Sequence, residues 1–185
     1  MAEFYLVSQL PSLEGLSDNS PLPITEERFM ELCSRFLSKK ALKILEQLTI
    51  NPPKQLNKTG SVLVDAWLES ERSLRIALGK ARAEKMKSYF EDMDVQIPVE
   101  HVKAVNFAME IENPLEAELF LNGYRLRILD SIKPMDNFSE EFVFYYGIKL
   151  KLMARIRQFD TEAGRVTYKA IYDSILSADR QEVKQ

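Results

Sequence analysis

The sequence predicts an all-α fold, an antiparallel, bundle-like array of about six to seven helices. Three observations carry this prediction. Glycine and proline are scarce, at six and eight among 185 residues, and they stand where helices should begin or end. Apolar residues recur at three- and four-residue spacing along most of the chain, which is the period of one helix face. Residues that cap helix N-termini precede several of these stretches.

The amino-terminal part predicts a loop and two helices. Phe4–Leu10 is short and apolar, so it fits either a strand or a helical turn. Residues 11–24 hold three prolines and predict a loop. Thr25 is the expected N-cap of the first amphipathic helix and Ser38 that of the second. The second helix should end before Asn51-Pro52-Pro53, because the residue before a proline disfavours helical backbone.

The middle of the chain predicts one long helix and one short helix. Residues 61–90 contain no proline, and we expect a helix along most of them. Its predicted inner stripe consists of Val62, Ala66, Leu74, Ala77, Leu78 and Ala81. A shorter helix is expected near residues 98–111, with Pro98 in its first turn.

The carboxyl-terminal part predicts three more helices. Asn113-Pro114-Leu115-Glu116 is the clearest start signal in the chain, since Asn caps, Pro has a preset φ and Glu can reach back. This helix should run to about Ile132. The next helix should begin at 137–141 and end before 159–161, and the last should end near Ala178. The 185 residues fit a single helical domain, 1–185, or two lobes, 1–60 and 61–185.

Composition and charge narrow the class of protein. A hydrophobic fraction of 45% with 29% charged residues is typical of a globular chain. The net charge of −3 argues against a surface tuned as a whole to nucleic acid or anionic lipid. The single Cys33 excludes an intramolecular disulfide, which favours a reducing, cytoplasmic setting. We recognise no signal peptide and no apolar run of about 20 residues that would span a membrane.

The search for a catalytic, metal or cofactor site finds no specific pattern. The glycines form no phosphate-binding loop. His101 is the only histidine, so a Ser-His-Asp triad or a histidine-rich metal site would lack parts, and we interpret it as a surface or packing residue. Cys33 lies on an apolar stripe and is interpreted as a buried, inert thiol. The sequence therefore predicts a protein that is not an enzyme and that needs no cofactor.

The distribution of charge along the chain favours protein–protein docking. The charged residues of 72–87 are basic except Glu84, whereas those of 91–118 are acidic except Lys103. Adjacent basic and acidic surfaces suit docking, where charge sets orientation and association rate. A solvated helix with internal ion pairs explains the pattern equally well. Nucleic-acid binding is a weaker alternative, because only Trp67 and Tyr89 flank the basic stretch as stacking aromatics.

Five aromatic residues gather before and within the predicted helix that starts at 137–141. Their helical spacing spreads them over more than half of the helix circumference, so they cannot all face one thin core. Core packing should account for most of them, and the rest would form a partner-contacting patch. These residues are Phe138, Phe142, Phe144, Tyr145 and Tyr146.

Several stretches together resemble a bacterial family that is found alongside the subunits of V-type ATPases and is thought to stand in for their C subunit, known by the letter d in eukaryotes. The opening FYLVSQLPSL and LPITEERFMELCSRFL resemble the start of that family. The stretch WLESERSLRIALGKARAEKM is similar to its tryptophan–arginine helix. NPLEAELFLNGYRLRILDSI and FSEEFVFYYGIKLKLMARIRQFDTEAGRVTYKAI resemble its carboxyl-terminal part.

The resemblance implies a fold like that of the V-type ATPase C subunit and a mechanical role without an active site. Proteins of this type cap the membrane rotor ring and hold the central stalk, so the stalk and ring are the implied partners, on the inner face of the cytoplasmic membrane. Trp67, Arg72, Arg75 and Arg82 are the residues we expect at the stalk or ring contact. Two other classes stay open: an all-α small-molecule-binding protein or enzyme, and a nucleic-acid-binding regulator.

Overall fold

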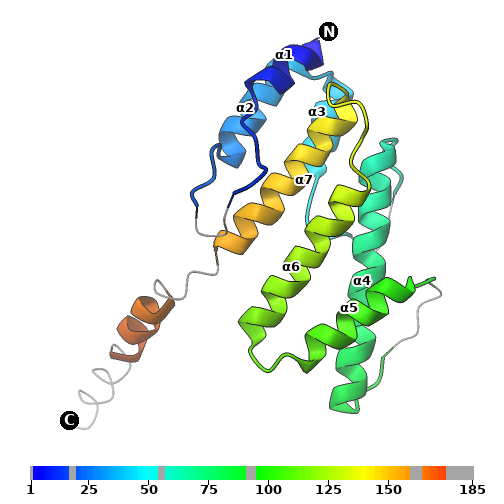
Figure 1. Ribbon diagram of the computed structural model, residues 1–185, viewed down its shortest axis with the longest axis vertical. Helices are drawn as coiled ribbons and strands as arrows, with labels where there is room; N and C mark the ends of the chain where they lie inside the picture. The colour runs from blue at the N-terminus through cyan, green and yellow to red at the C-terminus, as the bar shows by residue number, and fades with distance from the viewer. Residues whose placement is uncertain (1, 17–19, 54–56, 91–94, 159–163, 174–185) are drawn as a thin grey trace, which may run out of the picture.

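The computed structural model describes residues 2–16, 20–53, 57–90, 95–158 and 164–173, and these form a packed array of helices without a strand (Figure 1). The all-α prediction is therefore confirmed. The labelled helices are α1 Ala2–Gln9, α2 Glu26–Phe36, α3 Lys39–Gln47, α4 Val62–Met86, α5 Val99–Glu110, α6 Pro114–Ser131 and α7 Glu140–Arg157. Residues 164–173 form a further helical segment.

The ambiguous first segment is a helix. α1 covers most of Phe4–Leu10 and buries Leu6 completely. A strand would need a neighbouring strand to pair its backbone groups, and the described part of the chain has none. A helix satisfies those groups within the segment itself, which explains why this short apolar run is helical.

The predicted N-caps of the helices are confirmed with one change of position. Thr25, Ser38 and Asn113 each accept a hydrogen bond from a backbone N–H in the first turn of α2, α3 and α6. Asn113 also donates from Nδ2 to Glu116 Oε1 at 3.0 Å, so the predicted reach-back exists between the two side chains. Pro98, expected in the first turn of α5, lies at the N-cap position and forms no side-chain bond there.

α7 is the central helix of the array. It contacts α2, α3, α4 and α6 (Figure 1). A helix with neighbours on several sides buries most of its circumference. This position explains why Phe144, Tyr145 and Tyr146 are all buried although they point in different directions. Phe138, by contrast, precedes α7 and is exposed.

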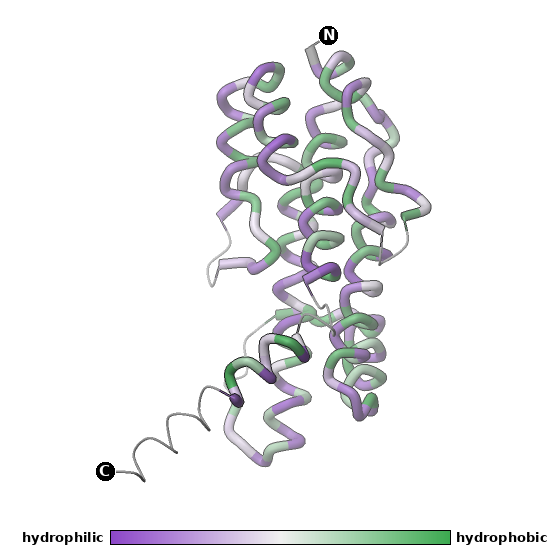
Figure 2. Tube along the Cα trace, turned by 90° about the vertical axis from the view of Figure 1, so that its left-hand side faces the viewer, coloured by the Kyte–Doolittle hydropathy of each residue, from purple (hydrophilic) through white to green (hydrophobic). Residues whose placement is uncertain are grey.

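The hydrophobic core has two parts. The larger unites α1, α2, α3 and α7 with the start of α4 and the end of α6, and the smaller lies among the rest of α4, α5 and α6. Figure 2 shows hydrophobic and hydrophilic residues interleaved along these helices, as expected when one face of each is buried. Because α4 and α6 contribute to both parts, residue 60 does not divide them. The division into domains stays a prediction.

The inner stripe of α4 differs from the predicted one at its start. Val62 is 82% exposed, and the buried face begins instead with Leu63, Val64 and Trp67. Ser61 is the N-cap, so Val62 is the first helical residue and points away from the array. Further along α4 the predicted stripe is confirmed, since Leu74, Ala77 and Leu78 are buried.

Three further features of the chain bear on the predictions. No helix among the described residues has the length and apolarity needed to cross a membrane. The predicted break at 159–161 and the end of the last helix near Ala178 lie outside the described residues, whereas 164–173 is helical as expected. Cys33 is buried completely, and this burial raises the pKa of its thiol to about 12, as an inert core residue requires.

Candidate functional site

The four predicted contact residues all lie on α4, but they occupy different environments. Trp67 is only 1% exposed and belongs to the larger core. Its indole Nε1 is buried without a hydrogen-bond partner among the described residues. Trp67 therefore packs in the interior, and in this arrangement a partner protein cannot reach its ring.

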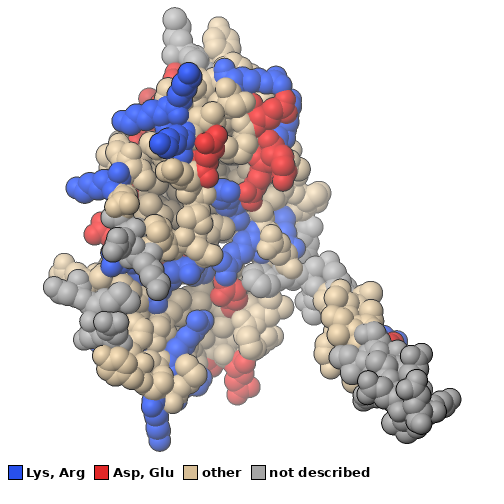
Figure 3. All heavy atoms as spheres, turned by 180° about the vertical axis from the view of Figure 1, so that it is seen from behind, with Lys and Arg blue, Asp and Glu red and all other residues tan. Residues whose placement is uncertain are grey.

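Arg72 and Arg82 are the two predicted residues that remain available. Arg72 is half-buried and Arg82 is exposed. Within the described chain, neither guanidinium forms a hydrogen bond or an ion pair. Figure 3 shows Lys and Arg side chains running as an interrupted band across the middle of one face of the molecule, with Asp and Glu gathered mainly above it. An unpaired arginine at such a surface suits a partner carboxylate.

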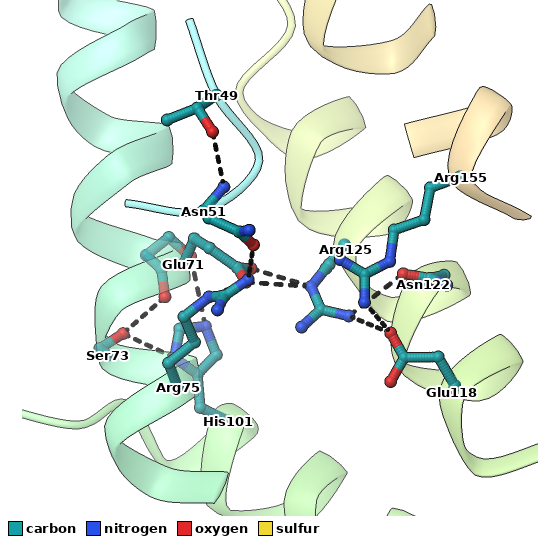
Figure 4. Close-up of polar contacts among 11 residues, drawn as sticks. Thr49, Asn51, Glu71, Ser73, Arg75, His101, Glu118, Asn122, Arg125 and Arg155 are labelled. Carbon is teal, nitrogen blue, oxygen red and sulfur yellow. Dashed lines mark hydrogen bonds and ion pairs between the residues drawn. The ribbon is translucent and has the colours of Figure 1, made fainter. Parts of the chain in front are cut away.

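Arg75 is committed to an interaction inside the fold. Its Nε donates to Glu71 Oε1 at 2.8 Å, one helical turn earlier. Its Nη2 donates to Asn51 Oδ1 at 2.5 Å, which ties α4 to the segment after α3 (Figure 4). Of the predicted residues, Arg75 is thus the one whose side chain fixes the array itself.

A buried carboxylate that the sequence pattern did not single out lies at the centre of this arrangement. Glu71 on α4 is 2% exposed, and it faces Arg125 on α6, which is 3% exposed. Arg125 Nε donates to Glu71 Oε1 at 3.2 Å and to Oε2 at 3.0 Å (Figure 4). A buried charge is tolerated when it is paired and hydrogen-bonded, and Glu71 is bonded by two guanidinium groups.

The network continues from Arg125 toward α7. Arg125 Nη1 donates to Asn122 Oδ1 at 3.1 Å and lies 3.6 Å from Glu118 Oε1. Arg155 Nη2 on α7 donates to the same Glu118 oxygen at 2.7 Å. With Arg75 and Glu71, three arginines meet two carboxylates between α4, α6 and α7. We refer to these five residues, with Asn51 and Asn122, as the arginine network.

His101 lies on the other side of α4, between two serine hydroxyls. Ser73 Oγ donates to the Ser70 carbonyl at 2.9 Å and lies 2.8 Å from His101 Nδ1. Since the Ser73 proton is thereby used, Nδ1–H must donate to Ser73 Oγ. Nε2 then accepts from Ser70 Oγ–H, at 3.3 Å. Burial lowers the pKa of this imidazole, which agrees with the neutral form that these contacts require.

His101 lines a groove of about 680 Å³. α4 forms one side and the segment before α5 forms the other. The polar and charged side chains that line it are Asn57, Lys58, Asp65, Glu69, Ser70, Arg72, Ser73, Gln96 and His101. His101 was predicted to be a surface or packing residue. It is a packing residue, only 4% exposed, and it lies at the edge of a groove.

A second polar cluster lies where α6 ends beside α7. Tyr145 donates from its hydroxyl to Asp130 Oδ1 at 2.5 Å, and Lys149 Nζ donates to both groups. Lys133 Nζ lies over the Tyr145 ring and pairs with Glu14 at 3.2 Å. Burial and the bond to Asp130 raise the pKa of the Tyr145 phenol. Each charged group of this cluster has an oppositely charged neighbour, so we interpret the cluster as a structural contact that holds α6 against α7.

Among the described residues, no group of three or more His, Cys, Asp or Glu side chains is arranged to hold a metal ion. Arg72 and Lys58 both line the groove beside His101, whereas Arg82 is not among its lining residues. No protein-family model, curated protein or solved structure matches this chain, so its function has to be inferred from its own residues.

Proposed function

We propose that this chain is a non-catalytic component of a bacterial V-type ATPase that couples the central stalk to the membrane rotor ring by protein–protein contacts. The stretches that resemble the family standing in for the V-type ATPase C subunit supply the identity of the partners and the expected form of the fold. The all-α array is compatible with that form. The protein would act on the inner face of the cytoplasmic membrane, without inserting into it and without binding nucleic acid.

The observation that best supports the proposal is that α4 is anchored in both parts of the core and also bears arginines that form no ion pair with another described residue. This helix of 25 residues contributes to both parts of the core, and the arginine network ties it to α6. On the same helix, Arg72 and Arg82 form no ion pair with another described residue. A helix that is anchored along its length and offers free arginines is suited to pass a load to a partner surface.

The test is a pull-down of the tagged full-length chain from gently solubilised membranes of its native host, with retained proteins identified by mass spectrometry. We expect recovery of the stalk and rotor-ring proteins of the V-type ATPase. Recovery of none of them, with the ATPase intact in the same sample, would overturn the proposal.

The arginine face is tested separately by Arg82→Glu. Arg82 is a better probe than Arg75. Arg75→Glu would place a second negative charge beside the buried Glu71 and would disturb the fold itself. The matched control is Arg127→Glu on α6, an arginine whose only described contact is the Tyr124 ring, at 5.7 Å. We expect the Arg82 variant to retain fewer ATPase proteins than the control, with equal helical content by circular dichroism. Equal recovery would remove Arg82 from the interface.

A further inference from the structure

We propose that the groove between α4 and the segment preceding α5 binds a small molecule that carries an oxyanion group, a phosphate or a carboxylate. Arg72 and Lys58 are its charge partners. This site shares Arg72 with the proposed coupling face, but it concerns a small ligand and not a partner protein, so binding of a small anion tests it separately. It rests on the charges, the rigid wall and the size of the groove.

The cations of the groove are not neutralised inside the fold. Arg72 from α4 and Lys58 from the preceding segment both line the groove, and neither forms a hydrogen bond or ion pair with another described residue. Asp65 also lines it, but Asp65 Oδ1 accepts from the backbone N–H and the hydroxyl of Thr59, at 2.8 Å each. That carboxylate is therefore held by its own turn and leaves both cations available to an incoming anion.

Two carboxylates of the lining oppose the anion: Asp65, which keeps its negative charge although Thr59 donates to it, and Glu69. Glu69 lines the groove and has no ion pair among the described residues. Its carboxylate repels an oxyanion, but contact with water in the open groove weakens that repulsion. Arg72 is half-buried, so its attraction for an anion is screened less than it would be at a fully exposed site. We therefore expect an anion to bind close to Arg72. Neutralising Arg72 should weaken anion binding, and neutralising Glu69 should strengthen it.

The wall of the groove is preorganised. His101 is held by Ser70 and Ser73 on its two ring nitrogens, so three polar side chains of the wall already have fixed partners (Figure 4). A ligand would not have to order them, which lowers the cost of binding. The N–H donors for an oxyanion then come from the guanidinium and the ammonium group, which are strong donors to phosphate and carboxylate.

The size of the groove fits a small molecule. About 680 Å³ lies within the range of roughly 300–1,000 Å³ in which small ligands bind. Apolar side chains share the lining with the charged ones and offer a surface to the uncharged part of a ligand; they are Ala66, Leu68, Val95 and Pro98.

His101 makes the test direct, because it is the only histidine in the chain and its ring forms part of the site. The full chain is titrated with inorganic phosphate and, in a second arm, with succinate, while the His101 ring resonances are followed by NMR. Sodium chloride at matched ionic strength is the control. We expect a saturable shift with phosphate or with succinate and none with chloride, and the arm that binds more tightly identifies the oxyanion.

Three variants then connect the shift to the proposed residues. Arg72→Gln should weaken binding by about tenfold, since it removes a charged donor. Glu69→Gln should strengthen binding, an effect that a purely structural role of these residues would not produce. Arg127→Gln, at an arginine outside the groove, should leave binding unchanged. The proposal is overturned if neither anion moves the His101 resonances beyond chloride, or if Arg72→Gln and Arg127→Gln bind alike.

Discussion

Arg125 on α6 donates from Nε to both carboxylate oxygens of Glu71 on α4, at 3.2 and 3.0 Å, and both side chains are buried. The pair lies where the two parts of the core meet, since Trp67 on one side belongs to the larger part and Leu74 on the other to the smaller. An ion pair in this place fixes how α4 and α6 sit against each other, because neither charge has water as an alternative partner.

Removing this carboxylate should be costly. Glu71→Ala leaves Arg125 buried without its main acceptor, and we expect the free energy of unfolding to fall by about 3–5 kcal/mol. Urea denaturation followed by circular dichroism measures the loss. The matched control is Glu84→Ala on the same helix, where the side chain is exposed and has no hydrogen bond or ion pair with another described residue, and a change within about 0.5 kcal/mol is expected. Equal stability of the two variants would show that the pair does not hold the array.

The spacing of apolar residues in the sequence places both Glu71 and Arg125 on buried helix faces. The distribution of charge along the chain does not single them out. Glu71 stands in the stripe Leu63, Trp67, Leu74, Leu78 of α4, at the spacing of their buried face. Arg125 stands in the same way between Leu121 and Leu129 of α6. Opposite charges placed inside two apolar stripes predict a buried ion pair if the helices are neighbours, and a single sequence does not give that neighbourhood.

The helix starts were predictable for a local reason, and the exposure of side chains was not. Ser38 and Asn113 act through bonds within their own first turn, so nearby residues determine them. The burial of Tyr145 and Tyr146 depends on α7 lying between other helices, which is a property of the whole array. For the same reason Trp67 was expected at a partner contact, although its place on the stripe of Leu63 and Leu74 indicates the core.

Gly147 should not tolerate a side chain. A Cβ there would lie 3.1 Å from Leu45 Cδ1 and 3.1 Å from Phe29 Cε1, both in the larger core. We expect Gly147→Ala to destabilise the fold by about 1–3 kcal/mol, despite a gain in helix propensity. Gly123 on α6 is the control, because its nearest atom is in the Arg127 guanidinium at 3.8 Å. Gly123→Ala should stabilise by about 0.5–1 kcal/mol in the same urea titration, and a loss at both sites would contradict the packing of α7.

The thiol of Cys33 should be unreactive in the folded protein. Its burial raises the pKa to about 12, so the thiolate that attacks disulfide reagents is scarce at mildly alkaline pH and is shielded as well. We expect Ellman's reagent to release almost no chromophore from the native chain and one equivalent after unfolding in urea. Rapid release from the native protein would show that α2 opens readily and exposes this part of the core.

His101 should make stability depend on pH. Burial lowers its pKa below the ordinary value of 6.5, so below that pH the unfolded chain binds a proton that the folded chain resists. Stability should therefore fall as the pH drops below 6.5, by at most about 1.4 kcal/mol per pH unit, until the folded imidazole is protonated as well. The loss would come from placing the charge of a protonated imidazole in a buried position.

Urea denaturation at about one pH unit above and one below that ordinary value measures this dependence, with His101→Gln as the comparison. An amide can still donate to one serine and accept from the other, but it does not titrate. Since carboxylates elsewhere contribute equally to both proteins, the difference between their pH dependences belongs to His101. We expect the wild-type chain to lose more stability than the variant between the two pH values. Equal losses would mean that the folded imidazole accepts a proton as easily as the unfolded one, and that its hydrogen bonds to Ser70 and Ser73 do not favour the neutral form.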